Sequence, residues 1–533
     1  MKNRLRTHPV SRSQASRAKQ GFDVIIVGGG SAGAVLCARL SAASQRRVLL
    51  LEASPNFAPN EYPSVLTDAS IVGGSPAFDW HYKSEDAARL GHNIPLPRGR
   101  VVGGSSAVNG TVAMRARPAD FARWAKRGIK GWSWEEVLAT YKALENTPTG
   151  DDAWYDRNGP FPIRQRTTEE NTPSMRAFVE ASRAVGLKYV SDFNGETQHG
   201  VGPYPLNVVD GVRINTGIAY LTTAVRVRPN LTIRSDAEVY NVVIEDKRAV
   251  GVKLVDGEIL RADEIILSAG TFGSPAILMR SGIGPWQHLH ELGIATIADL
   301  PVGDRLKDQP FFFNVYALKR QVNAMKPAAG AIVWTRSQRA EPDDLDLQIS
   351  GTHFFDPKNS PTGGAIVLAC AVTLPKSIGS LRLTSRDPRV GPRIQYNFFD
   401  DPNDLERMVE AVQLSRKIGR TAPFSDLLDH EIAPGNVVRN GESLRANIVA
   451  TVDAYEHPTS TVPLGADSDP TAVVNAWGNV RGIEALRVVD ASVFPDIPSA
   501  PTNVTTIMVA ERIAAKIAGE DQISKFQLTE TVA

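Results

Sequence analysis

The sequence of 533 residues is poor in cysteine and has no excess of either charge. Its two cysteines, Cys37 and Cys370, both stand in apolar stretches, so no disulfide framework and no thiolate metal site can be drawn. We therefore predict no bound metal and a reducing, cytoplasmic compartment. Lys and Arg number 59 against 58 Asp and Glu. No basic run is interleaved with aromatic residues, so nucleic acid is not expected as a partner.

Long apolar runs are also absent. None approaches the ~18 residues that a membrane helix needs, so we predict a soluble chain without a membrane span. Residues 1–20 are basic, contain no acidic residue and lack the apolar core of a secretory signal. We interpret them as a disordered basic tail, with an organelle transit peptide as the alternative.

A glycine-rich turn near the amino terminus carries the strongest local signal. Phe22–Val27 is a short apolar run typical of a buried parallel strand. Gly28, Gly30 and Gly33 follow with G-x-G-x-x-G spacing and open a helical pattern. The first glycine turns out of the strand, the second lets the backbone approach a pyrophosphate, and the third lets the helix pack on the strand. The N–H groups of the helix N-terminus, at Ser31, would then face the phosphates.

A second predicted strand, Val48–Leu51, ends in Glu52, about 20 residues beyond the glycines. An acid there accepts hydrogen bonds from ribose hydroxyls and would repel a 2′-phosphate, so FAD or NAD is favoured over NADP. For the glycine motif alone, a tight turn in an ordinary α/β sheet is the alternative. The two strands, the helix and the terminal acid together favour a dinucleotide site.

A second cluster of small residues lies in PRGRVVGGSSAVN, residues 97–109. Its backbone can lie against a ligand with N–H groups and hydroxyls turned inward, whereas an exposed turn is the alternative. The preceding segment, 53–93, has little periodicity and is either a lid over the cofactor or a surface excursion. The cofactor-binding residues predicted in the cluster are Arg100, Val102, Gly104, Ser105 and Asn109.

Helices are predicted over 131–144, with a capping box at Ser133 and Glu136, and over 173–185. Four strand patterns between 231 and 270 suggest a meander. Its edge at Val239 could touch the adenine of a dinucleotide. The meander ends at Ala269, and a short helix beginning at Ser274 would bring another N-terminus toward the cofactor.

Strand patterns dominate from about residue 305 to 452. The runs 345–350, 365–372, 381–385 and 393–399 follow one another without helices, which implies an antiparallel sheet. One long amphipathic helix, 402–418, follows them. We assign this part of the chain to a substrate domain.

The last part of the chain is predicted to return to the cofactor. A strand over 486–489 ends at Asp490 and Ala491, and a helix begins near Thr502. The N-terminal amides of this helix would suit the N1/C2=O edge of a flavin, where negative charge appears on reduction.

Taken together, these motifs resemble the glucose-methanol-choline (GMC) flavoprotein oxidoreductases in order and over nearly the whole chain after residue 20. The most specific is GTFGSPAILMRSGIG. The motifs that carry the resemblance are the glycine fingerprint with Glu52, PRGRVVGGSSAVN, GTFGSPAILMRSGIG (270–284), EHPTSTVPLG (456–465), VVDASVFP (488–495) and TNVTTIMVAERIA (502–514).

The resemblance implies an α/β (α+β overall) fold with a Rossmann-like FAD-binding domain built from discontinuous segments and a substrate domain on an antiparallel sheet. It implies oxidation of a small-molecule alcohol to a carbonyl, with oxygen or a quinone-type compound as electron acceptor. The predicted division is a tail (1–20), an FAD-binding domain (21–150, 207–305 and 455–525) and a substrate domain (151–206 and 306–454).

The resemblance also selects His457 as the catalytic base. A lone histidine before a proline is more often structural. At this position of the family motif, however, neutral His457 is expected to take the hydroxyl proton while the α-hydrogen leaves as hydride to flavin N5. The unperturbed pKa of imidazole, about 6.5, leaves the base form abundant near neutrality.

Departures from the family pattern bear on the substrate. Pro501 stands where the family usually has His or Asn, so Thr459, Asn503 and backbone amides become candidates for orienting the substrate oxygen. Family members that resemble pyridoxine oxidases have proline at this position. This resemblance implies that the substrate is an aromatic or heteroaromatic primary alcohol. A choline-type or aliphatic alcohol dehydrogenase, or a hydroxynitrile lyase on the same scaffold, stays open as an alternative.

Three further departures concern the neighbourhood of the predicted base. Glu456, in place of a common aromatic, either contacts a polar or cationic substrate or points to solvent. Gln309 stands where many members have histidine. No His or Cys near Val108 is available for the covalent flavin link that some members make, so we predict non-covalent FAD.

Overall fold

The computed structural model describes residues 21–439 and 441–519. The predicted basic tail, residues 1–20, lies outside the described residues, as does the end of the segment predicted over 455–525. No helix within the described ranges is long and apolar enough to cross a membrane. Both cysteines, Cys37 and Cys370, are buried and unbridged.

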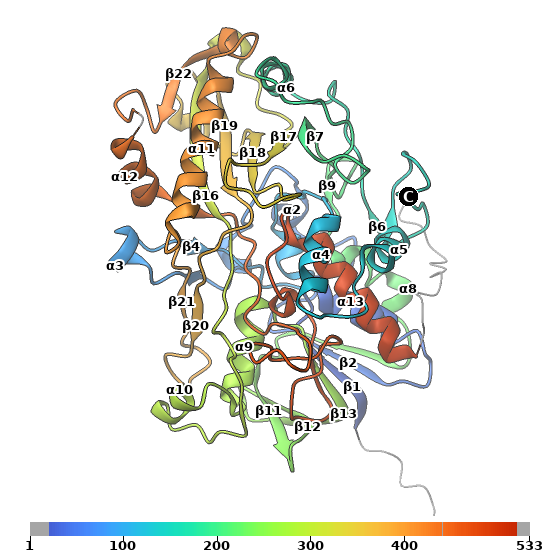
Figure 1. The fold of residues 1–533 in the computed structure, drawn as a ribbon. Helices are drawn as coiled ribbons and strands as arrows, with labels where there is room; N and C mark the ends of the chain where they lie inside the picture. The colour runs from blue at the N-terminus through green and yellow to red at the C-terminus, as the bar shows by residue number, and fades with distance from the viewer. Residues whose placement is uncertain (1–20, 440, 520–533) are drawn as a thin grey trace, which may run out of the picture.

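A mostly parallel sheet forms the lower part of the molecule (Figure 1). Its central strands run parallel, and its far edge is an antiparallel meander. The final strand pairs with the same central strand as the first does. The order is β10 (Leu231–Arg234), β2 (Val48–Leu51), β1 (Phe22–Val27), β13 (Ile259–Leu267), β12 (Arg248–Leu254) and β11 (Val239–Glu245), with β24 (Leu486–Val488) also on β13.

The predicted bounds of β1 and β2 are those of the structure. Both strands lie in the core because their apolar, β-branched runs are covered by helices. Helix α1 (Ser31–Leu40) packs beside the final helix, α13 (Thr502–Ala518). A buried ion pair joins them, with Arg39 Nε 2.6 Å from Glu511 Oε2.

Two local predictions in this half were wrong. β10 is not part of the meander but lies beside β2 at the opposite edge, because alternation shows that a segment is a strand and not which strand it pairs with. Helix α9 (Gly270–Arg280) begins four residues before the predicted Ser274 and contains Pro275. The carbonyl of Thr271, which a proline nitrogen cannot serve, accepts the Thr461 hydroxyl at 2.7 Å instead.

A second, antiparallel sheet occupies the upper part of Figure 1, with α11 (Pro402–Gly419) packed against it. β20 (Ser380–Arg382) and β21 (Arg393–Gln395), from the last two predicted runs, are antiparallel but form a separate pair. The sheet order is β22 (Leu428–Ala433), β16 (Pro310–Leu318), β19 (Ala365–Val372), β18 (Leu347–Thr352), β17 (Ala331–Thr335) and β7 (Gly200–Pro203), with β23 (Asp453–Ala454) also on β16.

The two helices predicted over 131–144 and 173–185 follow their sequence signals. The predicted capping box is formed in α5 (Trp134–Leu144), where Ser133 Oγ accepts the Glu136 N–H and Glu136 Oε2 accepts the Ser133 N–H. α6 (Pro173–Ala184) is close to its predicted range. The remaining elements of four or more residues are α2 (Ser64–Thr67), α3 (Ala87–Leu90), α4 (Pro118–Lys126), α7 (Thr216–Ala219), α8 (Thr223–Arg226), α10 (Trp286–Glu291), α12 (Glu442–Thr451) and the 3-10 turn Gly104–Ala107.

The shorter strands pair at the periphery of the two sheets. They are β3 (Tyr82–Lys83), β4 (Pro95–Leu96), β5 (Glu145–Asn146), β6 (Phe161–Pro162), β8 (Val208–Val209), β9 (Val212–Arg213), β14 (Ile283–Gly284) and β15 (Ala298–Asp299). The strands of the two main sheets come from the segments assigned to the FAD-binding and substrate domains respectively, while the domain boundaries themselves stay a prediction.

Candidate active site

A cavity of about 1160 Å³ runs from the carboxyl ends of β1 and β2 to the antiparallel sheet. Val27 and Leu51 line one part of it, and Phe311 and Ser350 line another. Ligands of open α/β sheets bind at the carboxyl ends of the strands. The cavity therefore joins a nucleotide-type crevice to a space under the second sheet.

At the end of the cavity near β1 and β2, glycine is required because backbone segments approach one another closely. Gly28 has φ +95°, and a Cβ there would lie 2.5 Å from the Ser268 carbonyl oxygen. A Cβ on Gly33 would lie 1.9 Å from the Gly28 oxygen, and one on Gly104 would lie 2.7 Å from Gly30 Cα. Gly28, Gly30 and Gly104 line the cavity, whereas Gly33 serves only the packing of helix on strand.

Three helix N-termini meet at the cavity. Ser31 begins α1, Gly270 begins α9 and Thr502 begins α13, and all three residues line it. The N-termini of α1 and α13 present N–H groups and a partial positive charge, whereas the Gly270 N–H at the start of α9 donates to the Asp490 carboxylate. The crevice therefore suits an anion such as a pyrophosphate.

Glu52 stands beside this anion site. Its Oε2 accepts the Gly29 N–H at 2.8 Å and its Oε1 accepts the Ser54 hydroxyl at 2.7 Å. Burial raises the pKa of Glu52, and these hydrogen bonds oppose the rise. The carboxylate lines the cavity and keeps lone pairs that could accept hydrogen bonds, so its contact with ribose hydroxyls stays a prediction.

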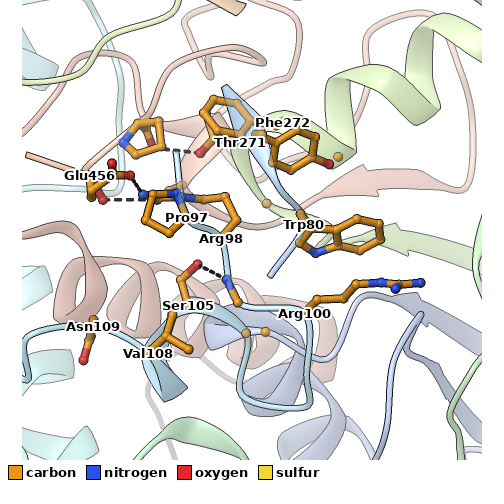
Figure 2. A pocket seen from close by; sticks show the side chains of 18 of the residues that line it. Trp80, Pro97, Arg98, Arg100, Ser105, Val108, Asn109, Thr271, Phe272 and Glu456 are labelled. Atoms are coloured by element: carbon orange, nitrogen blue, oxygen red, sulfur yellow. Dashed lines mark hydrogen bonds and ion pairs between the residues drawn. The ribbon is translucent and has the colours of Figure 1, made fainter. Parts of the chain in front are cut away.

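Most of the other predicted cofactor residues also line the cavity; they are Arg100, Ser105, Asn109, Val239, Ala269, Asp490, Ala491 and Asn503. The Asp490 carboxylate is already used, because it accepts the Gly270 N–H and the Ser274 hydroxyl and so caps α9. Val102 does not line the cavity: it is buried, and its carbonyl accepts the Tyr62 hydroxyl. Figure 2 shows Trp80 beside Arg100, whose Cζ lies 4.9 Å from the indole centroid.

At the other end of the cavity lies His457. Its backbone N–H donates to Asp308 Oδ1 at 2.9 Å, and its Nδ1 lies 2.8 Å from Gln309 Oε1. Among the described residues, the hydrogen bonds of His457 involve its backbone N–H and Nδ1 and not its Nε2. Burial, with a smaller contribution from the Arg98 guanidinium, lowers the pKa of His457 to about 3. The imidazole is therefore neutral over the ordinary pH range.

Arg98 and Glu456 form a pair next to this histidine. The Arg98 guanidinium donates to the Glu456 carbonyl oxygen at 3.1 Å and forms an ion pair with its carboxylate, as Figure 2 shows. Glu456 has φ +67°, a conformation that is strained for a non-glycine residue. The pair thus holds the strained backbone that leads into His457 and neutralises the carboxylate.

Pro501 and Thr459 occupy different places. Pro501 lines the cavity and offers no donor, as predicted. Thr459 does not line it, because the residue is fully buried and its backbone N–H donates to the Lys307 carbonyl. Thr459 is therefore ruled out as a group that orients the substrate oxygen. Asn503 lines the cavity and stays a candidate.

Comparison with known proteins places this cavity in a family. Residues 22–311 and 375–510 match the sequence profiles described as GMC oxidoreductase. The chain belongs to the GMC oxidoreductase family. It is 33% identical to an oxygen-dependent choline dehydrogenase of Photobacterium profundum over 535 residues, 94% of each chain. It is 34% identical to one of Rhizobium johnstonii, over 94% of this chain and 96% of that one.

Solved structures give the same family. The chain superposes on the crystal structure of pyridoxine 4-oxidase from Mesorbium loti with a TM-score of 0.86 and 32% identity, over 94% of this chain and all of the other. The predicted family and mixed α/β fold are confirmed. FAD, the predicted cofactor, is the cofactor of GMC oxidoreductases.

The residues of this chain fit FAD. The glycine contacts leave room for a pyrophosphate, and the N-termini of α1 and α13 complement its charge. Asn503 Oδ1 accepts the Ser31 hydroxyl at 2.8 Å, while its buried Nδ2 has no hydrogen-bond partner in the part of the chain that the structure describes. A buried donor of this kind needs an acceptor, which a polar edge of the bound cofactor can supply.

Replacing Gly104 with alanine should weaken FAD binding, because the Cβ at φ +53° would press on Gly30 Cα and separate the two loops. We expect the Kd of FAD to rise at least about tenfold, or roughly 1.4 kcal/mol. Titration of the apoprotein with FAD measures it. Gly91→Ala is the control, because Gly91 also has positive φ, +82°, but nothing lies within 4 Å of the added Cβ. Equal Kd values for both variants would contradict the assignment of this contact.

FAD should be released by acid precipitation and leave the yellow colour in the supernatant. Neither cysteine lines the cavity, and of the described histidines only His81 and His457 do so, outside the 103–109 loop. The covalent link of some family members is therefore not expected in that loop. A yellow pellet would overturn this prediction.

Proposed function

We propose that this protein oxidises a primary alcohol on an aromatic or heteroaromatic ring to the aldehyde, with His457 as general base. The observation that carries the proposal is a neutral imidazole on the cavity wall whose Nδ1 is engaged by Gln309. Nε2 is then the atom left to accept a proton. Oxidation of an alcohol is the chemistry of the GMC family.

His457 would act at the hydroxyl of the alcohol. Its Nε2 accepts the hydroxyl proton, which leaves electron density on the substrate oxygen and weakens the bond to the α-hydrogen. When bound, FAD supplies the acceptor for the hydride at N5. The Asp308 carboxylate holds the His457 backbone N–H and the Gln309 amide holds the ring at Nδ1, so the imidazole keeps its orientation during proton transfer.

Aromatic side chains near His457 support a ring-bearing substrate. Tyr455 lies 4.4 Å from the imidazole centroid and stacks on Phe311 at 4.3 Å with 9° between the planes. Phe313 and Pro501 also line the cavity. Such surfaces favour planar apolar rings by stacking and edge contacts. Proline at 501 also fits the similarity to pyridoxine 4-oxidase, which is named for a heteroaromatic alcohol.

A choline-type substrate is the second candidate, because several relatives are named choline dehydrogenases. An aromatic wall can also hold a quaternary ammonium group. The Glu456 carboxylate next to the base is neutralised by Arg98, which argues against it as the counter-ion. Asp453 also lines the cavity, and its carboxylate, whose Oδ1 accepts the Ala454 N–H at 2.8 Å, is the other candidate counter-ion for a cation.

Anaerobic reduction of the flavin separates these candidates. Pyridoxine and benzyl alcohol should bleach the flavin absorbance at lower concentration and faster than choline, glucose or an aliphatic alcohol. Faster bleaching by choline would contradict the aromatic substrate and favour the choline-type substrate. No bleaching by any alcohol, with cleavage of a cyanohydrin, would identify a hydroxynitrile lyase. Hydrogen peroxide release compared with quinone reduction then decides the electron acceptor.

A further inference from the structure

We infer that Gln309 is a positioning residue that keeps the proton of His457 on Nδ1 and so leaves Nε2 as the basic nitrogen. Gln309 touches neither the cavity nor the reacting atoms, since it is fully buried behind the histidine. Its consequence for the reaction rests on the proposed function, whereas the position of the proton does not.

The orientation of the Gln309 amide is set by its other contacts. Its Nε2 donates one hydrogen bond to the Thr373 carbonyl at 2.8 Å and one to the Pro498 carbonyl at 3.0 Å. A flipped amide would place Oε1 against two carbonyl oxygens and lose both bonds in a buried place. Oε1 therefore faces His457, and an oxygen there can only accept.

The tautomer of His457 follows from this orientation. A neutral imidazole has one N–H, and only the Nδ1–H tautomer can donate across the 2.8 Å to Gln309 Oε1. The other tautomer would set the Nδ1 lone pair against the amide oxygen. In other proteins, a hydrogen-bond acceptor behind a functional histidine likewise selects its tautomer and orientation.

A second glutamine, Gln348, contacts Tyr455, two residues before His457, in the same manner and offers a matched control. Gln348 is also buried, its Nε2 donates to the Ser499 carbonyl at 3.2 Å, and its Oε1 accepts the Tyr455 hydroxyl at 3.3 Å. Both glutamines thus hold the chain ahead of Pro501, and one serves the base while the other serves a tyrosine.

The first experiment reads the proton directly. Long-range ¹H–¹⁵N NMR of protein labelled with ¹⁵N-histidine, with His457 assigned by its loss in His457→Ala, reports which ring nitrogen carries hydrogen. We expect the Nδ1–H form in the wild type and in Gln348→Leu, and a mixture of tautomers in Gln309→Leu. The Nε2–H form in the wild type, or an unchanged spectrum in a folded Gln309→Leu, would overturn the inference.

The second experiment measures the anaerobic rate of flavin reduction by pyridoxine and benzyl alcohol. Gln309→Leu should lower the rate about 10- to 100-fold with less effect on substrate Kd, whereas Gln348→Leu should keep the pH profile of the wild type. Gln309→Glu keeps an oxygen acceptor toward Nδ1 but sets its second oxygen against the Thr373 and Pro498 carbonyls that Gln309 Nε2 serves, so it is expected to regain only part of the rate. A native rate in a folded Gln309→Leu would overturn the role.

The pH profile adds a readout that loss of packing would not produce. An ionised carboxylate at 309 stabilises imidazolium, so the acid limb of Gln309→Glu should lie at higher pH than that of the wild type. Arg98, Asp308, Glu456 and Tyr455 also face His457 and are unchanged in all three variants. If neither alcohol reduces any variant while the NMR result holds, the proposed function fails and the tautomer assignment stands.

Discussion

His457→Ala is expected to slow reduction of the flavin by alcohol about 10²- to 10⁴-fold, the usual range for loss of a general base. The alcohol proton then has no acceptor in a buried place, while FAD binding should persist because His457 lies apart from the glycine loops. Anaerobic stopped-flow reduction measures the loss. His290→Ala, at an exposed histidine outside the cavity, should keep the native rate.

A near-native rate in His457→Ala would rule out the role of this histidine. The pH dependence of the wild type gives a second check. Because burial lowers the pKa of His457 to about 3, the base is already neutral at pH 5 and above. Titration of His457 itself should therefore leave the rate level between about pH 5 and pH 8, whereas Asp308, whose pKa burial raises to about 6, is a separate source of an acid limb in this range. An acid limb near pH 6.5 that persists in Asp308→Asn would mean that the imidazole is solvated.

Predictions from the sequence were accurate where the signal is local. The bounds of β1 and β2 and the capping box at Ser133 depend on residues a few positions apart, and they were confirmed. The same reasoning could not show that β10 lies beside β2, because that pairing joins residues far apart in the chain. Nor could such reasoning place the start of α9 at Gly270. Pro275 leaves the Thr271 carbonyl without its helical N–H donor, and only the fold shows that the Thr461 hydroxyl donates to that carbonyl instead.

Prediction of the candidate site was likewise possible only for residues whose signal is local in the sequence. The glycine motif and its acid were found because their spacing is fixed by one strand, turn and helix. Arg98 and Gln309 were not assigned roles, since they meet Glu456 and His457 across 358 and 148 positions of the sequence. The signal for Gln309 was its departure from the family histidine. Only the fold shows that its amide oxygen faces the base.

A buried ion pair joins Arg115, ahead of α4, to Glu145 in β5. Arg115 and Glu145 are 2% and 0% exposed, and Arg115 Nη2 donates to Glu145 Oε1 and to the Trp154 carbonyl. Burial raises the pKa of Glu145 to about 7, although Arg115 opposes the rise. Removing Arg115 leaves an uncompensated buried carboxyl.

Arg115→Met should therefore destabilise the folded protein by about 3–5 kcal/mol, measured as a lower urea midpoint with FAD in excess. The folded-state pKa of Glu145 would rise further above its unfolded value of 4.5, so the loss should be smaller at pH 5 than at pH 8. Arg183→Met is the control, because its pair with Glu180 is half exposed and should contribute less than about 1 kcal/mol. Arg115→Met with Glu145→Leu should recover most of the loss, and equal midpoints for the two single variants would refute the argument.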